Sequence, residues 1–361
     1  MLSLLDTVAL SLWSLAARRR RAPALHPLLG IPGADSDAAL PDSLPAVLAC
    51  AGVAAPDEAV VRVREGARTA LERAAAGGIA AIAWGDPRYP SLLASIPDPP
   101  LALWVRGEAG GLRLPAVAIV GSRAASPYGI EAASRLAGEL AAADMAIVSG
   151  LARGVDSAAH RGALAADGLT IAVLGSGIDV VYPPEHAGLA AAISTRGAVI
   201  SEYPPGSPPL KQYFPARNRI ISGLSLGVVV IEAADRSGSL ITAARALEQG
   251  RHVMAVPGNI LSGRFRGSHA LLRDGAAVVD GAADVLAELG ASSLRALCAA
   301  PRRNTPGDRV LGAMVAGEPY DLDALALETG LAPPALLPRL LDLELRGSVR
   351  RVGGGRFMRA R

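Results

Sequence analysis

The feature that most constrains the fold is a regular alternation of short apolar segments and longer helical segments between residues 116 and 279. The apolar segments are short and rich in β-branched side chains, as in strands buried on both faces of a sheet. They lie at residues 116–120, 146–149, 170–174, 198–201, 227–231, 252–256 and 277–279. Helical periodicity fills most of the intervals, for example over 128–143 and 155–166, and no hairpin turn joins neighbouring strands. This order predicts an α/β fold with a doubly wound parallel sheet of the Rossmann type.

The flanking segments predict two further domains. Residues 1–75 are rich in alanine and mostly helical in pattern, which predicts a small helical domain. Residues 76–290 form the α/β domain, with additional short strands predicted near 79–84 and 101–105. After a linker, residues 305–361 show three helical segments and then two short strands joined by three glycines, the pattern of a winged helix. Winged helices bind nucleic acid in some proteins and protein in others, so the ligand of this domain stays open.

Charge is balanced over the chain but segregated locally. The 36 Lys and Arg residues exceed the 33 Asp and Glu residues by 3. The window 204–230 contains no acidic residue but holds Arg217, Arg219 and Lys211, the one lysine of the chain. A second acid-free window, 249–273, holds four arginines: Arg251, Arg264, Arg266 and Arg273. Such segregation indicates a site for a polyanion, although a solvated surface produces the same pattern in either window alone.

Cysteine content and the N-terminal segment indicate a cytoplasmic protein. Cys50 and Cys298 are too few and too far apart for a disulfide framework or a metal site, so a reducing cytosol is expected. The apolar run 2–17 precedes the arginines 18–21, whereas a signal peptide carries its positive charge first. About 16 residues including Asp6 make a poor membrane span. We expect a soluble amphipathic helix and no membrane partner, with a membrane-associated helix as the alternative.

Glycine and arginine residues follow the predicted strands where an open parallel sheet binds its ligands. The first strand is followed by Gly121, Ser122 and Arg123, and the second by Gly150 and Arg153. Glycine lets the backbone approach an anion closely, and arginine offers a two-pronged phosphate contact. Neither a G-x-G-x-x-G nor a G-x-x-x-x-G-K-[ST] motif is present, which argues against an NAD-dependent oxidoreductase and a P-loop ATPase. Tight strand-to-helix turns are the alternative explanation of these glycines.

The candidate acid–base residues favour structural roles. Asp156 and His160 are four residues apart on a predicted helix, so they could pair, but an Asp at a helix start more often caps it or fixes a neighbouring loop. Glu202 and Glu232 end strands, where they more often orient arginines or cap loops. We therefore assign no catalytic residue, no metal and no cofactor.

Aromatic residues are few but gather beside the first acid-free window. The chain has 3 Trp, 6 Tyr and 3 Phe, and Tyr182, Tyr203, Tyr213 and Phe214 lie close together in sequence. Exposed rings beside cations are typical of single-stranded nucleic-acid sites, because stacking contributes about 1–3 kcal/mol per base without sequence preference. Rings buried at a sheet edge give the same pattern. We expect Phe214 to pack in the core and leave the tyrosines open.

Taken together, seven segments resemble the DNA-processing protein A (DprA/Smf) family. They occur in the order and spacing of that family: 118–123, 149–156 with His160, 173–179 with Tyr182 and Pro183, 201–203, 214–224, 237–243 and 256–258. The resemblance spans residues 115–279 and is specific. The flanking domains resemble the family in architecture, which implies a SAM-like helical domain, an extended Rossmann fold and a winged helix.

The resemblance implies a non-enzymatic recombination mediator that binds and protects incoming single-stranded DNA and loads the RecA recombinase during natural transformation. It also implies a homodimer formed through the Rossmann domain. Carried over by motif position, with Arg219 added from the same segment, the DNA-binding residues are Gly121, Ser122, Arg123, Gly150, Arg153, Lys211, Arg217, Asn218 and Arg219.

Two departures limit the resemblance. The usual Tyr-Pro-x-x-Asn is Tyr-Pro-Pro-Glu-His at 182–186, which puts a DNA contact from that loop in doubt. The glycines of a helix-hairpin-helix remain only as Gly30 and Gly33, so no DNA binding is assigned to the N-terminal domain. The alternative function is a nucleotide phosphoribohydrolase of the lysine-decarboxylase-like Rossmann group, whose Pro-Gly-Gly-x-Gly-Thr signature is absent.

Overall fold

The computed structural model describes most of the chain in two compact units, Met1–Cys298 and Ala299–Arg361. The described residues are 2–19, 44–50, 53, 55–290, 309–314, 319–329, 331, 336–337, 339–340, 343–344, 349–352 and 356–359. Gly30, Gly33, Cys298 and the predicted linker beyond residue 290 lie outside them.

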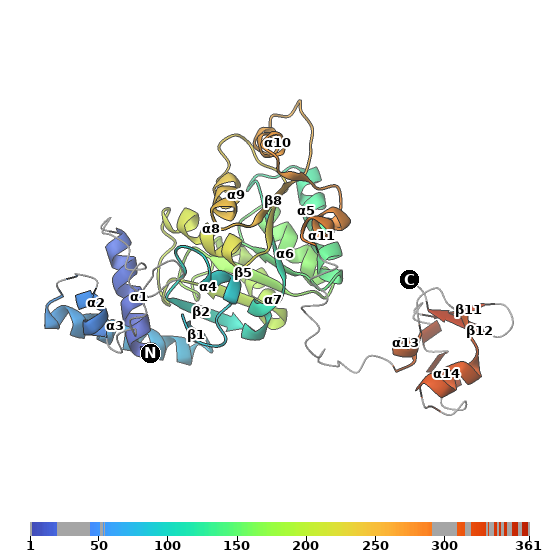
Figure 1. Ribbon diagram of the computed structural model, residues 1–361, viewed down its shortest axis with the longest axis horizontal. Helices are drawn as coiled ribbons and strands as arrows, with labels where there is room; N and C mark the ends of the chain where they lie inside the picture. Colours follow the sequence, from blue (N-terminus) through green and yellow to red (C-terminus); the bar gives the residue numbers. More distant parts are fainter. Residues whose placement is uncertain are drawn as a thin grey trace. The chain divides into compact units, whose positions relative to one another are not determined.

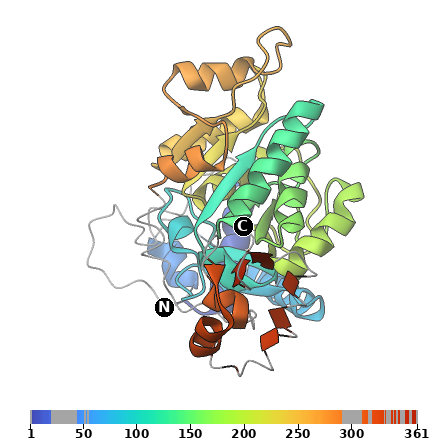
Figure 2. The ribbon, with the colours of Figure 1, turned by 90° about the vertical axis from the view of Figure 1, so that its right-hand side faces the viewer.

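A nine-stranded sheet forms the centre of the first unit (Figures 1 and 2), in the order β1-β2-β6-β5-β4-β3-β7-β8-β9. β1 pairs with β2 and β2 with β6 in antiparallel fashion, and all other neighbours are parallel. The strands are β1 (Ala80–Ala83), β2 (Ala102–Gly107), β3 (Ala116–Val120), β4 (Ala146–Ser149), β5 (Thr170–Leu174), β6 (Ala198–Ser201), β7 (Gly227–Val230), β8 (His252–Ala255) and β9 (Ala277–Val278). The predicted parallel sheet is confirmed, with β7, β8 and β9 each ending one residue early.

Helices cover both faces of the sheet (Figure 1), as a doubly wound fold requires. Along β3, Val117 and Ile119 pack toward one layer of helices, whereas Ala118 and Val120 pack toward the other. The first layer contains α5 (Pro127–Ala142), α6 (Val155–Ala165), α7 (Ala187–Arg196) and α11 (Ala282–Glu288). The second contains α4 (Ser91–Ala94), α8 (Tyr213–Gly223), α9 (Gly238–Glu248) and α10 (Arg266–Arg273). Two short 3₁₀ segments are η2 (Ala109–Arg113) and η3 (Pro184–His186).

The N-terminal segment is helical, as predicted. It forms α1 (Leu4–Arg19), α2 (Leu44–Cys50) and α3 (Asp57–Ala76). Their apolar side chains share one hydrophobic cluster with the sheet: Val8 and Ala74 belong to the same cluster as Trp104 of β2 and Leu174 of β5. The helical region is therefore packed onto the β1–β5 end of the sheet. Among the described residues, no helix combines the length and apolar character that a membrane crossing needs.

The second unit is a small α/β module with its own core. It contains α13 (Arg309–Ala313), α14 (Leu322–Thr329), β10 (Pro319–Tyr320), β11 (Val349–Val352) and β12 (Arg356–Arg359). The three strands form an antiparallel sheet in the order β10-β12-β11. Its core includes Val310, Leu325, Leu340 and Phe357. Helices followed by a two-stranded wing confirm the predicted winged helix.

Candidate nucleic-acid interface

The candidate site lies at the carboxyl edge of the parallel sheet, at the point where the strand order reverses. From β3 the chain builds β4, β5 and β6 on one side, and then crosses to β7 on the other side of β3. Such a switch point leaves a crevice beyond the strand ends. The loops after β3 and β7 meet there, because the Ser122 N–H donates to the Glu232 carbonyl oxygen at 2.7 Å.

Glu232 fixes the loop after β3. Its side chain is 1% exposed and accepts hydrogen bonds from Ser126 N at 3.0 Å and from Ser126 Oγ at 2.5 Å. Arg264 approaches the same carboxylate at 3.5 Å and donates to the Ala124 carbonyl oxygen at 2.7 Å. The predicted loop-capping role of Glu232 is confirmed, and one arginine of the second acid-free window supports this loop.

An exposed guanidinium and two aromatic rings from three separate segments meet at this edge: the loop after β3, the loop after β5 and the first turn of α8. The Arg123 guanidinium carbon lies 5.5 Å from the centroid of the Phe214 ring, and that ring lies 5.5 Å from the Tyr182 ring. Tyr182 is 41% exposed and Phe214 is half-buried, so the expectation that Phe214 packs in the core is corrected here. A side chain at Gly175 would clash with the Phe214 ring, since a Cβ there would lie 2.9 Å from Phe214 Cδ1. We call Arg123, Tyr182, Phe214 and Lys211 the basic–aromatic edge.

Lys211 and Arg123 are exposed cations of this edge. Lys211 lies two residues before α8 and is exposed, as is Arg123. Neither forms an ion pair with a residue that the structure describes. Both are therefore available to an external anion.

The other two tyrosines of the aromatic group belong to the core. Tyr203 and Tyr213 are 2% and 5% exposed, and their rings stack at 3.8 Å. They stabilise the start of α8 rather than present a face to solvent. Of the three tyrosines left open by the sequence, only Tyr182 lies at the surface.

Arg217 is buried beneath the loops and is 3% exposed. Its Nη1 donates to the carbonyl oxygens of Gly150, at 2.7 Å, and Val173, and its Nε has no partner among the described residues. Burial lowers the pKa of the Arg217 guanidinium to about 10, although the nearby Asp156 carboxylate opposes this shift. A Cβ at Gly150 would lie 2.4 Å from Arg217 Nη1, so this glycine makes room for the arginine. Arg217 thus ties the ends of β4 and β5 together from inside.

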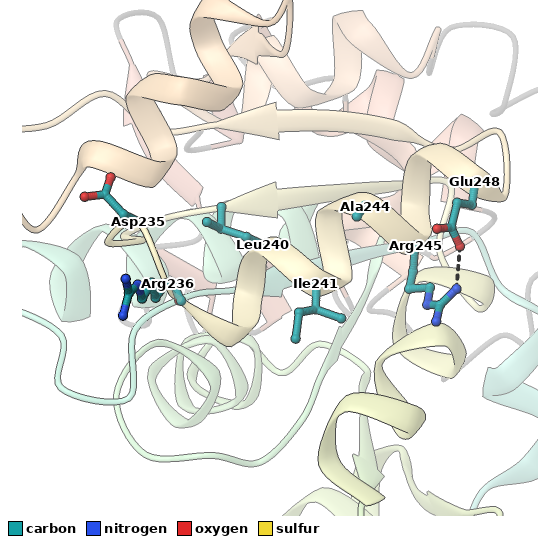
Figure 3. Close-up of a pocket in the computed structure, with 8 residues that line it drawn as sticks. Asp235, Arg236, Leu240, Ile241, Ala244, Arg245 and Glu248 are labelled. Atoms are coloured by element: carbon teal, nitrogen blue, oxygen red, sulfur yellow. Dashed lines mark hydrogen bonds and ion pairs between the residues drawn. The ribbon is translucent and has the colours of Figure 1, made fainter. Parts of the chain in front are cut away.

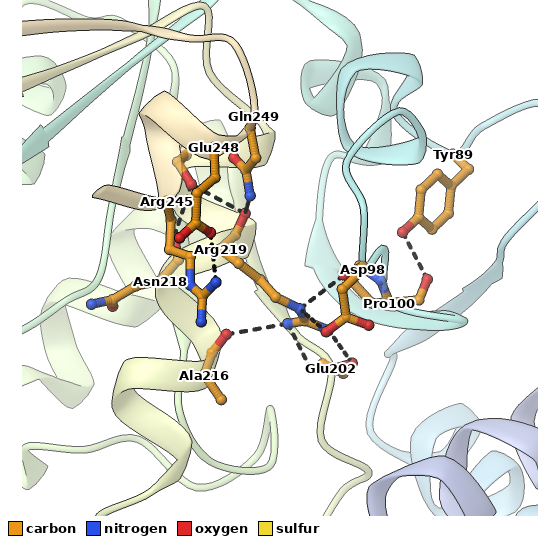
Figure 4. Close-up of polar contacts among 11 residues, drawn as sticks. Tyr89, Asp98, Pro100, Glu202, Ala216, Asn218, Arg219, Arg245, Glu248 and Gln249 are labelled. Carbon is orange, nitrogen blue, oxygen red and sulfur yellow. Dashed lines mark hydrogen bonds and ion pairs between the residues drawn. The ribbon is translucent and has the colours of Figure 1, made fainter. Parts of the chain in front are cut away.

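Arg219 is locked into an internal ion-pair network (Figure 4). Its Nη2 lies 2.6 Å from Glu202 and its Nε lies 3.0 Å from Asp98. Burial lowers the pKa of Arg219, but the charges of Glu202 and Asp98 outweigh burial and leave the pKa above its usual value. The predicted role of Glu202, to orient an arginine, is confirmed. Arg219 joins α8 to the end of β6 and to the segment before β2, and does not project to the surface.

The remaining predicted contacts lie at or near the surface. Arg153, on the loop after β4, forms an exposed ion pair with Glu185 at 2.5 Å. Asn218 Nδ2 donates to the Gly238 carbonyl oxygen at the start of α9, at 3.3 Å. The predicted contacts with partly or fully exposed side chains or backbone are Gly121, Ser122, Arg123, Arg153, Lys211 and Asn218.

Asp156 and His160 do not pair with each other. The Asp156 carboxylate accepts from the N–H groups of Gly150 at 3.2 Å and Ala152 at 3.3 Å, so it fixes the loop as expected. His160 Nδ1 contacts Thr170 Oγ1 at 2.7 Å, and burial lowers the pKa of His160 to about 3. Within the described part of the chain, no group of three or more His, Cys, Asp or Glu residues could hold a metal ion.

An open pocket lies along the outer face of α9 (Figure 3). Leu240 and Ile241 line it between its two ends, and Arg245 pairs with Glu248 at 2.6 Å at one end. Asp235 and Arg236 lie at the other end. Its charged residues are of mixed sign, two acidic and two basic.

Two family profiles match this chain, one over the α/β domain and one over the winged helix. A family profile described as DNA recombination-mediator protein A matches residues 80–290, and one described as DprA winged helix domain matches residues 298–355. Protein Smf of Escherichia coli is 43% identical over 277 residues, which cover 74% of each chain.

The solved structures that are similar to this one include two DNA processing proteins. The X-ray structure of DNA processing protein A from Streptococcus pneumoniae superposes with a TM-score of 0.66 and 38% identity, covering 78% of this chain and 97% of that chain. DNA processing protein A from Helicobacter pylori, described for its single-stranded DNA binding mode, superposes with a TM-score of 0.54 and 30% identity. The match covers 59% of this chain and 96% of that chain. The chain therefore belongs to the DNA recombination-mediator protein A (DprA/Smf) family.

Proposed function

We propose that this protein is a recombination mediator that binds single-stranded DNA along the basic–aromatic edge. The observation that carries the proposal is the meeting of Arg123 and Tyr182, from two loops, with Phe214 of the first turn of α8 at the sheet's switch point. Cations next to accessible rings suit a single strand, whose phosphates and unpaired bases are both exposed. The H. pylori relative, whose description names single-stranded DNA binding, supports the same ligand class.

In this proposal the exposed cations bind phosphates and the rings stack on bases. Lys211 and Arg123 supply charge without first breaking an ion pair to any residue in the described ranges. Arg153 contributes only after its contact with Glu185 opens. Arg217 adds positive potential from beneath the loops, because its buried charge is held mainly by carbonyl oxygens. Its role and that of Arg219 are then to position the loops and α8.

We further infer the biological role from family membership. A mediator of this family would protect incoming single strands, load the RecA recombinase during natural transformation, work in the cytoplasm and dimerise through the Rossmann domain. No catalytic role is proposed, because Glu232 and Asp156, two carboxylates of these loops, are engaged with loop backbone. The partner of the winged helix stays open.

The proposal is tested by fluorescence anisotropy with a labelled oligothymidylate across a sodium chloride series. We expect tight binding at low salt, similar affinity for mixed-sequence single strands, and a loss of log K of about 0.7 per phosphate contact for each unit of log salt. In parallel, the protein is incubated with a nucleoside monophosphate and release of the free base is measured. Absence of oligonucleotide binding at low salt would overturn the proposal. Release of the free base from the nucleotide would overturn it in favour of the phosphoribohydrolase.

A further inference from the structure

The N-terminal helices share a core with the loops of the candidate site. Leu151, two residues before Arg153, belongs to the hydrophobic cluster of α1 and α3. So does Ile178 on the loop after β5, and Val181, next to Tyr182, packs against that cluster. The helical region therefore supports the loops of the basic–aromatic edge from behind.

One side chain of α3 reaches beyond this apolar contact. Arg73, in the last turn of α3, donates to the Asp179 carboxylate from Nε at 3.0 Å and from Nη2 at 2.7 Å. Asp179 lies on the loop after β5 and its side chain is 21% exposed. The pair joins residues that are 106 positions apart in the sequence.

The other oxygen of Asp179 holds a second loop. Asp179 Oδ1 accepts from the Gly206 N–H at 2.7 Å, on the loop after β6. The two loops are also joined by the Gly177 N–H, which donates to the Ser207 carbonyl oxygen at 2.9 Å. Gly206 has a φ of +84°, and a Cβ there would lie 2.5 Å from Arg73 Nη1, so the turn accepts the guanidinium only without a side chain. Burial raises the pKa of Asp179, but the hydrogen bonds from Gly206 and Arg73 outweigh burial and leave the pKa below its usual value.

These two loops carry two members of the basic–aromatic edge. Tyr182 follows Asp179 by three residues, and Lys211 follows Gly206 by five. A movement of the loops relative to each other would separate the ring from the lysine. The Arg73–Asp179–Gly206 contact is thus placed to hold a stacking group and a phosphate ligand at a fixed spacing.

We propose that Arg73 of α3 is a positioning residue for single-stranded DNA binding, which makes the N-terminal helical region part of the functional site. The inference rests on the proposed function. Arg73 acts through Asp179 and the two loops, and does not itself bind a phosphate. The Arg73 guanidinium donates two hydrogen bonds to the Asp179 carboxylate. A lysine ammonium keeps the charge but does not reproduce this planar geometry.

The test compares Arg73→Gln with Arg68→Gln, which removes the same charge from an exposed position of the same helix. Affinity for a labelled oligothymidylate is measured across a sodium chloride series. We expect Arg73→Gln to weaken binding roughly fivefold, as residues that act through others do, with an unchanged salt slope. Arg73→Lys should restore part of the loss, and Arg68→Gln should bind like the wild type.

A second variant separates positioning from damage to α3. Asp179→Asn leaves every α3 side chain in place and should weaken binding as Arg73→Gln does, and the double variant should be no weaker than either single variant. A salt slope reduced by about 0.7 in Arg73→Gln would show a direct phosphate contact and overturn the inference. Equal affinities of Arg73→Gln and Arg68→Gln would also overturn it while leaving the proposed function intact. Failure of the wild type to bind would instead overturn the proposed function, and this inference with it.

Discussion

Replacing Glu202 by glutamine tests whether the buried ion pair of α8 is a structural element. Glu202→Gln keeps the shape of the side chain but removes its charge. Among the residues that the structure describes, Arg219 then keeps only Asp98 as a carboxylate partner, at 3.0 Å. The Arg219 and Glu202 side chains are 7% and 4% exposed, so water cannot replace the lost carboxylate. We therefore expect a large loss of stability from this single change.

The magnitude follows from the burial and geometry of the pair. Removing one partner of a buried ion pair costs about 3–5 kcal/mol, because the other charge is left uncompensated. Asp98 and the remaining amide oxygen of the glutamine still accept hydrogen bonds from Arg219, which places the cost near the lower end, about 3 kcal/mol. Because about 1.4 kcal/mol corresponds to a factor of ten, the unfolding equilibrium constant should rise about a hundredfold.

Urea unfolding followed by tryptophan fluorescence measures this change in the first unit alone. All three tryptophans, Trp13, Trp84 and Trp104, lie in that unit. The matched control is Glu248→Gln, which removes the same charge from the exposed pair with Arg245.

We expect a clear shift of the midpoint for Glu202→Gln and almost none for this control. The double variant Glu202→Gln and Arg219→Gln should lose less free energy of unfolding than the sum of the losses of the two single variants. If Glu202→Gln and Glu248→Gln unfold at the same urea concentration, the internal role assigned to Arg219 is wrong.

Three further outcomes are expected. Glu185→Gln frees Arg153 from its exposed ion pair and should tighten oligothymidylate binding several-fold at low salt in anisotropy titrations. Unchanged affinity would show that Glu185 does not compete with DNA phosphates for Arg153. Phe214→Ala should weaken binding about tenfold by loss of stacking, without a change in salt slope. Lowering the pH from 7 to 5 should destabilise the first unit by about 2 kcal/mol through His160. The unfolded state takes up a proton below pH about 6.5, whereas buried His160 stays neutral down to about 3. His160→Gln should remove this part of the pH dependence in urea unfolding.

The parallel strands could be predicted nearly to the residue because burial on both faces leaves a continuous apolar signature. The segments 116–120, 146–149, 170–174 and 198–201 were predicted with the bounds that the structure has. The carboxyl edge followed from topology, since glycines and arginines after parallel strands must meet there. The sequence therefore predicts the fold correctly, and the placing of a DNA site at this edge stays a prediction.

The orientation of individual cations could not be predicted in the same way. Arg217 and Arg219 are two residues apart on α8, so at 3.6 residues per turn they point to nearly opposite sides of the helix. Both are nevertheless buried, one against the ends of β4 and β5 and the other against Glu202 and Asp98. Acid-free sequence around them indicated a surface, but their partners come from distant segments.

The half-buried position of Phe214 and the contact of Arg73 with Asp179 could not be predicted either, because both depend on residues distant in the sequence. Phe214 is held between Gly175 and Tyr182, and Arg73 contacts Asp179, all of them far away in the sequence. Periodicity reports which face of an element is apolar, but not which side chain a loop from another strand brings to it. These long-range contacts required the structure.

The most direct test of the central claim is the affinity of Arg123→Ala and Lys211→Ala for single-stranded oligonucleotides across a salt series. We predict that each variant weakens binding of all sequences alike and lowers the salt slope by about 0.7. The control is Arg196→Ala, because Arg196 ends α7 just before β6 begins and so lies at the opposite edge of the sheet. It should bind like the wild type. Unchanged affinity in both Arg123→Ala and Lys211→Ala would contradict the account.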